Sequence, residues 1–146
     1  MKYSSAKILA LLSIIKNAQL EAPIEFLNAE PEELRAVCNG VGSADLPKSI
    51  RKILTKAFRC AEASASIHDW QFHHSDGLKH SLKKANDLFL ANALLEVRYW
   101  RSAWWQLPLR IWEERKVIIA YRTLEKCSAG AFALGFCRKV NGKGSV

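Results

Sequence analysis

The sequence predicts a small all-α domain. Apolar residues recur at helical spacing over long stretches, and the helix-breaking residues proline and glycine are confined to a few short segments. No convincing alternation of apolar and polar residues marks a core strand. The chain has 146 residues, 49% of them apolar and 25% charged, which is an ordinary globular composition and enough for one hydrophobic core. We therefore expect residues 1–146 to form a single domain.

The first element, in residues 1–20, is expected to be an N-terminal helix that covers residues 5–19. Two lysines precede an apolar run at residues 8–15, a pattern that also occurs in signal peptides. Lys16 ends this run after eight residues, and no convincing small-residue cleavage site follows. The run is also too short to span a bilayer. A helix packed on the domain is favoured over a signal peptide, and we expect no transmembrane segment elsewhere.

Shorter elements come next. Pro31 is expected to start one helical turn just before a glycine-containing segment at residues 38–43. After Pro47, residues 48–72 contain no proline or glycine and carry apolar side chains at helical spacing. Residues 73–77, with the sequence His-His-Ser-Asp-Gly, are typical of a turn.

The second half is expected to hold two further helices. The first covers residues 79–106, and Pro108 interrupts or ends it. The second covers residues 111–126, and residues 140–146 form a frayed tail. Because the turn at residues 73–77 is short, the long helices on its two sides are expected to lie antiparallel.

The positive charge is concentrated at the C-terminal end. Residues 98–146 carry ten basic and three acidic side chains, a net charge of +7 out of +8 for the whole chain. Four of the five tryptophans lie in this region, interleaved with arginines, a combination that suits an anionic surface such as a phospholipid membrane. The residues expected at the membrane interface are Trp100, Trp104, Trp105, Arg101 and Arg110. The alternative is that the tryptophans pack in the core or on the first helix.

The cysteines leave the compartment open. Cys38, Cys60, Cys127 and Cys137 form no CxxC pair, which argues against a zinc ribbon or a redox motif. Buried thiols are favoured, and two disulfides are the alternative for an exported chain. Secretion, a phage particle and the cytoplasm are all compatible with this pattern, and the oligomeric state is not determined.

The residues with the clearest chemical potential are His68 and Asp69. A histidine can exchange a proton near neutral pH, and a carboxylate can bind a hard cation. In an antiparallel pair of helices, His68 can face Asp87, which would orient the imidazole. Asp69 points about 100° away around the same helix and is expected to face the glycine segment. The two acids are thus expected to have separate roles.

Three short stretches resemble the phospholipase A2 family, in the compact, disulfide-poor form of bacterial, phage and parvovirus capsid proteins. They are Asn39-Gly40-Val41-Gly42, His68-Asp69-Trp70-Gln71-Phe72 and Asn86-Asp87-Leu88-Phe89. The resemblance covers residues 36–95 and includes the order, spacing and helical context of the three stretches.

The resemblance implies a Ca²⁺-dependent hydrolase that cleaves the sn-2 ester of glycerophospholipids. It implies that His68 deprotonates the attacking water, that Asp87 holds the imidazole, and that the Gly40 N–H and Ca²⁺ stabilise the oxyanion. The ligands of Ca²⁺ that it implies are Asp69 and the backbones of Cys38, Gly40 and Gly42.

Two departures from the family pattern concern turnover more than the fold. Phe72 replaces the tyrosine that usually supports the histidine, and Ser43 stands where a third glycine is common. An inactive relative that binds a membrane or a protein is therefore the main alternative to the enzyme.

Other classes of function fit the residues less well. A basic nucleic-acid-binding helical protein explains the charge but leaves the histidine, the two acids and the glycine segment without a role, so nucleic acid is an unlikely partner. A zinc cluster of His73, His74 and His80 with His68 lacks a helical i,i+4 pair of histidines. A metal phosphohydrolase of the His-Asp type needs a further histidine upstream, and none precedes His68.

Overall fold

The computed structural model describes residues 3–38 and 56–142, with side chains described as far as residue 126. The described residues form helices and contain no strand, which confirms the all-α class for this part of the chain. In chain order the elements are α1 (Ser5–Asn17), α2 (Ile24–Asn28), α3 (Pro31–Val37), the 3₁₀ turn η1 (Arg59–Ala61), α5 (Glu62–His73), α6 (Lys79–Trp100), the 3₁₀ turn η2 (Trp104–Gln106) and α7 (Leu107–Gly142).

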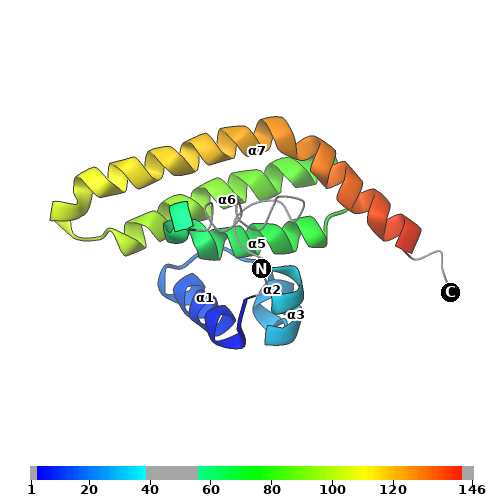
Figure 1. Cartoon of the computed structure of the whole chain (residues 1–146), viewed down its shortest axis with the longest axis horizontal. Helices are drawn as coiled ribbons and strands as arrows, with labels where there is room; N and C mark the ends of the chain where they lie inside the picture. The colour runs from blue at the N-terminus through cyan, green and yellow to red at the C-terminus, as the bar shows by residue number, and fades with distance from the viewer. Residues whose placement is uncertain (1–2, 39–55, 143–146) are drawn as a thin grey trace.

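The helices form two groups (Figure 1). In one group α6 packs between α5 and α7, and in the other α1 and α3 pack against α5. Helices α6 and α7 are antiparallel, because Arg98 contacts Glu114 near the η2 end whereas Lys83 contacts Glu125 at the far end. The C-terminal part of α7 projects beyond the rest of the described structure (Figure 1).

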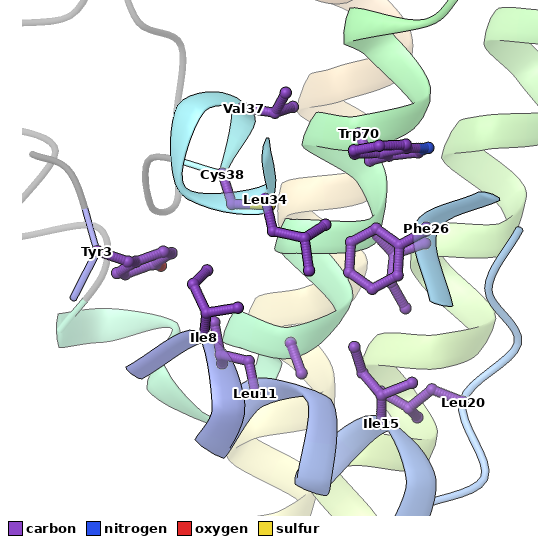
Figure 2. Packing of buried hydrophobic residues seen from close by; sticks show 12 residues of the cluster. Tyr3, Ile8, Leu11, Ile15, Leu20, Phe26, Leu34, Val37, Cys38 and Trp70 are labelled. Atoms are coloured by element: carbon purple, nitrogen blue, oxygen red, sulfur yellow. The ribbon is translucent and has the colours of Figure 1, made fainter. Parts of the chain in front are cut away.

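The first hydrophobic cluster joins the N-terminal helices to α5 (Figure 2). Phe26 of α2 meets Trp70 of α5 edge to face, with ring centroids 5.7 Å apart. Burial of side chains of this size stabilises the fold by about 1.5–3 kcal/mol each. The buried members of the cluster are Tyr3, Ile8, Leu11, Ile15, Leu20, Phe26, Leu34, Val37, Cys38, Ala63, Ile67 and Trp70.

A second cluster lies between η1, α5, α6 and α7, and small side chains let these helices approach closely. Its buried members are Cys60, Ala61, Ala65, Phe89, Ala93, Val97 and Val117. Its members on α6 (Phe89, Ala93 and Val97) belong to the buried side of that helix.

The turn between α5 and α6 agrees with the prediction for residues 73–77. Helix α5 ends at His73, and Gly77 has a φ of 77°, a left-handed conformation that glycine adopts without steric cost. The carboxylate of Asp76 accepts hydrogen bonds from the Leu78 N–H (2.9 Å) and the Ser81 hydroxyl (2.7 Å). Asp76 therefore links the turn to the residue before α6 and to the first turn of α6.

The start of α5 differs from the helix expected over residues 48–72. The α-helix begins only at Glu62, after η1, and residues 48–55 lie outside the described residues. The carboxylate of Glu96 on α6 accepts hydrogen bonds from the Ala63 N–H (3.1 Å) and the Ser64 N–H (2.9 Å). Glu96 thereby takes the role of an N-terminal cap from a separate helix.

The other boundaries also differ from the expectation. Helix α6 ends at Trp100 rather than at residue 106, and η2 leads into α7. Pro108 is the second residue of α7, where a missing N–H costs no helical hydrogen bond. Helix α7 continues past residue 126 to Gly142, so residues 140–142 are helical, whereas residues 143–146 of the expected tail lie outside the described residues.

Candidate active site around His68

His68 lies between α5 and α6, and its side chain is buried, with 8% of the residue exposed. Its ring lies against those of Phe72 and Phe89, with centroids 4.3 Å and 5.3 Å away. Its Nε2 lies 2.9 Å from Oδ1 of Asn86 on α6. The ring is thus held on its faces by aromatic side chains and at one nitrogen by an amide.

This environment keeps the imidazole neutral. Burial lowers the pKa of His68 to about 4, and the hydrogen bond with Asn86 opposes only part of that effect. Because the amide oxygen of Asn86 accepts, Nε2 carries the ring proton. Nδ1 is then the nitrogen with the lone pair, the form that a general base requires.

Asp87 does not contact His68 in the way the sequence analysis expected, and Asn86 takes its place. The Asp87 carboxylate is half-exposed, forms an ion pair with Lys83 (3.0 Å) and accepts a hydrogen bond from the Tyr121 hydroxyl (2.7 Å). These contacts hold the pKa of Asp87 below its usual range, with the Tyr121 hydrogen bond as the main cause. Asp87 therefore links α6 to α7, not to α5.

The helical period explains why Asn86, and not Asp87, contacts His68. The buried residues of α6 follow one stripe, and Asn86 lies in it between Leu82 and Phe89. Asp87 is rotated by about 100° from Asn86, which carries its carboxylate out toward water. A carboxylate inside the stripe loses its hydration and needs buried donors, as Glu96 has in the Ala63 and Ser64 N–H groups.

Asp69 faces different neighbours from His68, as the helical period predicts. It is partly buried and lies close enough to Tyr3 and Cys38 to affect their ionisation. Burial is the main cause that raises the pKa of Cys38 to about 12, and the negative charge of Asp69 adds to it. Burial likewise raises the pKa of Tyr3, with contributions from Glu62 and Asp69. The charge of Asp69 thus acts on Cys38, which lies two residues before Gly40 in the sequence.

The predicted calcium ligands are described only in part. Gly40 and Gly42 lie outside the described residues, as does Ser43, whereas Asp69 and Cys38 are both described and the charge of Asp69 acts on the Cys38 thiol. Within the described residues, no group of three or more His, Cys, Asp or Glu side chains could hold a metal ion, so the histidine zinc cluster is not found there.

The described cysteines are thiols rather than disulfides. Cys38 and Cys60 are both buried and free, which favours buried thiols over paired cysteines at these two positions. The Cys38 thiol lies 3.5 Å from the backbone carbonyl oxygen of Ser66 on α5. The side chains of Cys127 and Cys137 lie outside the described residues.

The buried polar residues beside this site were not predicted from the sequence. Glu96 is fully buried and accepts the Ser64 hydroxyl (2.7 Å) in addition to the two amides at the start of α5. Burial raises its pKa, although the hydrogen bonds favour the charged form. Glu62 is also buried and binds the Tyr3 hydroxyl (2.7 Å) and the Lys7 ammonium (2.6 Å). Asn86 and Glu96 occupy positions that the helical period assigns to the apolar stripe of α6. A polar residue at such a position was the sequence signal that could have found both.

A groove of about 530 Å³ lies beside the α5–α6 turn, and His68 is not among the residues that line it. Its lining is mixed, with the Trp70 ring and several polar side chains. The lining residues are Pro23, Glu25, Trp70, Gln71, His74, Ser75, Asp76, His80, Ser81, Lys84 and Ala85.

The tryptophans near the α6–α7 connection are exposed and do not pack in the core. The exposed fraction is 83% for Trp104, 68% for Trp105, 60% for Trp112 and 44% for Trp100. Arg101 and Arg110 of the predicted interface lie in the same connection and its flank, and both are partly buried. The core alternative is therefore wrong for these tryptophans.

Comparison of the chain with protein-family models, with curated proteins and with solved structures gave no match. None of the helices in the described part of the chain has the length and apolar character needed to cross a membrane.

Proposed function

We propose that this chain is a phospholipase A2-like hydrolase with His68 as its general base and Asn86 as the residue that orients it. The observation that carries the proposal is the 2.9 Å hydrogen bond between His68 Nε2 and Asn86 Oδ1 across α5 and α6. It fixes the tautomer of a neutral histidine and leaves Nδ1 to take a proton from water. The phospholipase A2-like fold is part of the same proposal.

The two antiparallel helices support this reading. Ser64 near the start of α5 contacts Glu96, whereas His68 further along α5 contacts Asn86, which is earlier on α6. The two helices therefore run in opposite directions. This arrangement presents His68 on one helix to Asn86 on the next, the position next to Asp87, which the resemblance implies as the partner.

Asparagine in place of aspartate has a chemical consequence. An amide oxygen can accept the Nε2 proton, but it carries no full negative charge to stabilise the imidazolium that forms when Nδ1 takes a proton. The low pKa of His68, about 4, agrees with this, because a base of low pKa holds a proton weakly. We therefore expect slow hydrolysis.

Asp69 and the backbones of Cys38, Gly40 and Gly42 are the residues that would hold Ca²⁺. The electrostatic effect of Asp69 on Cys38 supports a shared site. When bound, Ca²⁺ would supply positive charge beside the ester carbonyl. The Asp69 carboxylate keeps its own role separate from His68, because the two side chains face different neighbours.

Fatty-acid release from mixed phospholipid vesicles, with calcium and with a chelator, tests the proposal. We expect release that needs calcium and that falls at least about 100-fold in His68→Gln, since general bases contribute rate factors of this order. His80→Gln, an exposed histidine of α6, is the matched control and should leave the rate unchanged.

A second variant separates a slow enzyme from an inactive relative. Asn86→Asp would place a carboxylate beside the imidazole, which should raise both the pKa of His68 and the rate of hydrolysis. Hydrolysis that ignores calcium or His68→Gln contradicts the catalytic role. Absence of hydrolysis in both the natural chain and a folded Asn86→Asp variant favours the binding-only alternative.

A further inference from the structure

The connection between α6 and α7 forms an exposed apolar end of the molecule, which we call the tryptophan tip and define as residues 98–116. It lies at one extremity of the long axis, where α6 ends and α7 begins (Figure 1). Trp104 and Trp105 occupy η2, with ring centroids 6.0 Å apart in an edge-to-face arrangement. Large exposed aromatic groups gathered in this way mark an interaction surface rather than ordinary protein surface.

The exposed apolar side chains of the tip come from three elements. Tyr99 and Trp100 end α6, with ring centroids 5.6 Å apart, and further residues lie on η2 and the first turns of α7. The large hydrophobic residues that are exposed in the tip are Tyr99, Trp100, Trp104, Trp105, Leu107, Leu109, Ile111 and Trp112.

The charge of the tip is positive. Residues 98–116 hold five basic and two acidic side chains, a net charge of +3. Both acidic side chains are engaged within the tip itself, Glu114 with Arg98 (3.1 Å) and Glu113 with Lys116 (2.6 Å). The formal excess of charge therefore comes from the other arginines, Arg101, Arg110 and Arg115.

We propose that the tryptophan tip docks on the surface of an anionic phospholipid bilayer. Tryptophan rings are favoured at the level of lipid headgroups, where an apolar body and one polar N–H are both accommodated. Arginine guanidinium groups bind phosphate with paired hydrogen bonds and are attracted to a negatively charged leaflet. The exposed apolar side chains and the net positive charge of the tip are complementary to the apolar layer and the anionic headgroups of such a surface.

The tip is remote from His68, and docking is independent of the proposed hydrolysis. Asn86 and Trp100 are 14 residues apart on α6, a separation of about 21 Å along the helix axis. Binding should therefore persist in a chelator and in His68→Gln, so that failure of docking and failure of catalysis can be told apart.

The test is co-sedimentation with vesicles of phosphatidylcholine and phosphatidylglycerol, and with vesicles of phosphatidylcholine alone, in the presence of a chelator. We expect binding to the anionic vesicles, weaker binding to the neutral ones, and a blue shift of tryptophan fluorescence. The double variant Trp104→Ala/Trp105→Ala should lower the partition coefficient at least tenfold. Arg110→Ala should lower the partition coefficient about fivefold, which is the contribution expected of one basic residue near an anionic surface.

Matched controls come from exposed residues elsewhere. Leu9→Ala removes an exposed apolar side chain of α1, and Lys79→Ala removes an exposed charge at the opposite end of α6. Both should bind vesicles as the natural chain does. Equal losses in these controls, no binding to anionic vesicles, burial of the tryptophans in a lipid-free dimer, or binding to duplex DNA without binding to vesicles would each overturn the proposal.

Discussion

The burial of His68 makes the stability of the fold depend on pH between about 4 and 6.5. The pKa of this histidine falls from 6.5 in the unfolded chain to about 4 in the native structure, chiefly because burial disfavours the charged ring. Between these values the unfolded chain binds more protons than the native one. Stability from this group is therefore fully present above pH 6.5 and is lost as the pH falls through the window.

The size of the effect follows from the two pKa values. Integration of the linkage relation predicts a loss of about 2 kcal/mol between pH 7 and pH 5, and about 3 kcal/mol by pH 4. Glu96 acts in the opposite direction, because burial raises its pKa and its contribution increases as the pH falls. A comparison with a variant that lacks only the histidine is needed to isolate the effect.

His68→Gln is that variant, because its amide can still donate to Asn86 Oδ1 without titrating. Urea unfolding followed by circular dichroism at pH 7, 6 and 5 gives the free energy of unfolding for both chains. The natural chain should lose about 2 kcal/mol more than His68→Gln between pH 7 and pH 5. Equal losses in the two chains, or an NMR titration of His68 near 6.5, would refute the burial argument.

Three further changes probe other described contacts. Glu96→Ala should destabilise the fold by about 3 kcal/mol in urea unfolding, because two buried N–H groups and the Ser64 hydroxyl lose their acceptor. A loss below about 1 kcal/mol would contradict this role of Glu96. Tyr121→Phe should leave the urea midpoint almost unchanged, because the Asp87 carboxylate is exposed and retains its ion pair with Lys83. A large shift of the midpoint would show that the Tyr121–Asp87 hydrogen bond links α6 and α7 more strongly than this. Alkylation mapped by mass spectrometry should modify Cys38 only after unfolding, because the thiol is buried and its pKa is about 12; rapid native labelling would contradict that.

The helical class could be predicted because periodicity is a local signal. Apolar residues at helical spacing placed the helices near residues 5–19 and 79–106, and Pro31 and Gly77 marked a start and a turn that are both observed. The ends of helices depend on contacts across the chain. The beginning of α5 at Glu62 is fixed by a carboxylate 34 residues later, which no local pattern reveals.

The partner of His68 could be predicted to lie on α6, but not to be Asn86. Asp87 was predicted for its charge, whereas the face of the helix decides which side chain meets α5. The spacing of Lys83 and Asp87, four residues apart, is typical of an ion pair on a solvated face, and that pair is present at 3.0 Å. The position of Asn86 between Leu82 and Phe89 was the better guide.

The polar residues in the buried stripe of α6 also determine which segments this helix can pack against. Asn86 binds His68, Asn92 bonds to both the N–H (2.9 Å) and the carbonyl (2.7 Å) of Glu21, and Glu96 caps α5. A displacement of α6 by one turn would keep much of its apolar burial but would separate all three polar groups from their partners. Buried groups without partners are costly, so the native register is favoured over its apolar alternatives. A polar residue on an apolar helical face therefore predicts a particular partner, and in this chain one such partner is the histidine of the proposed active site.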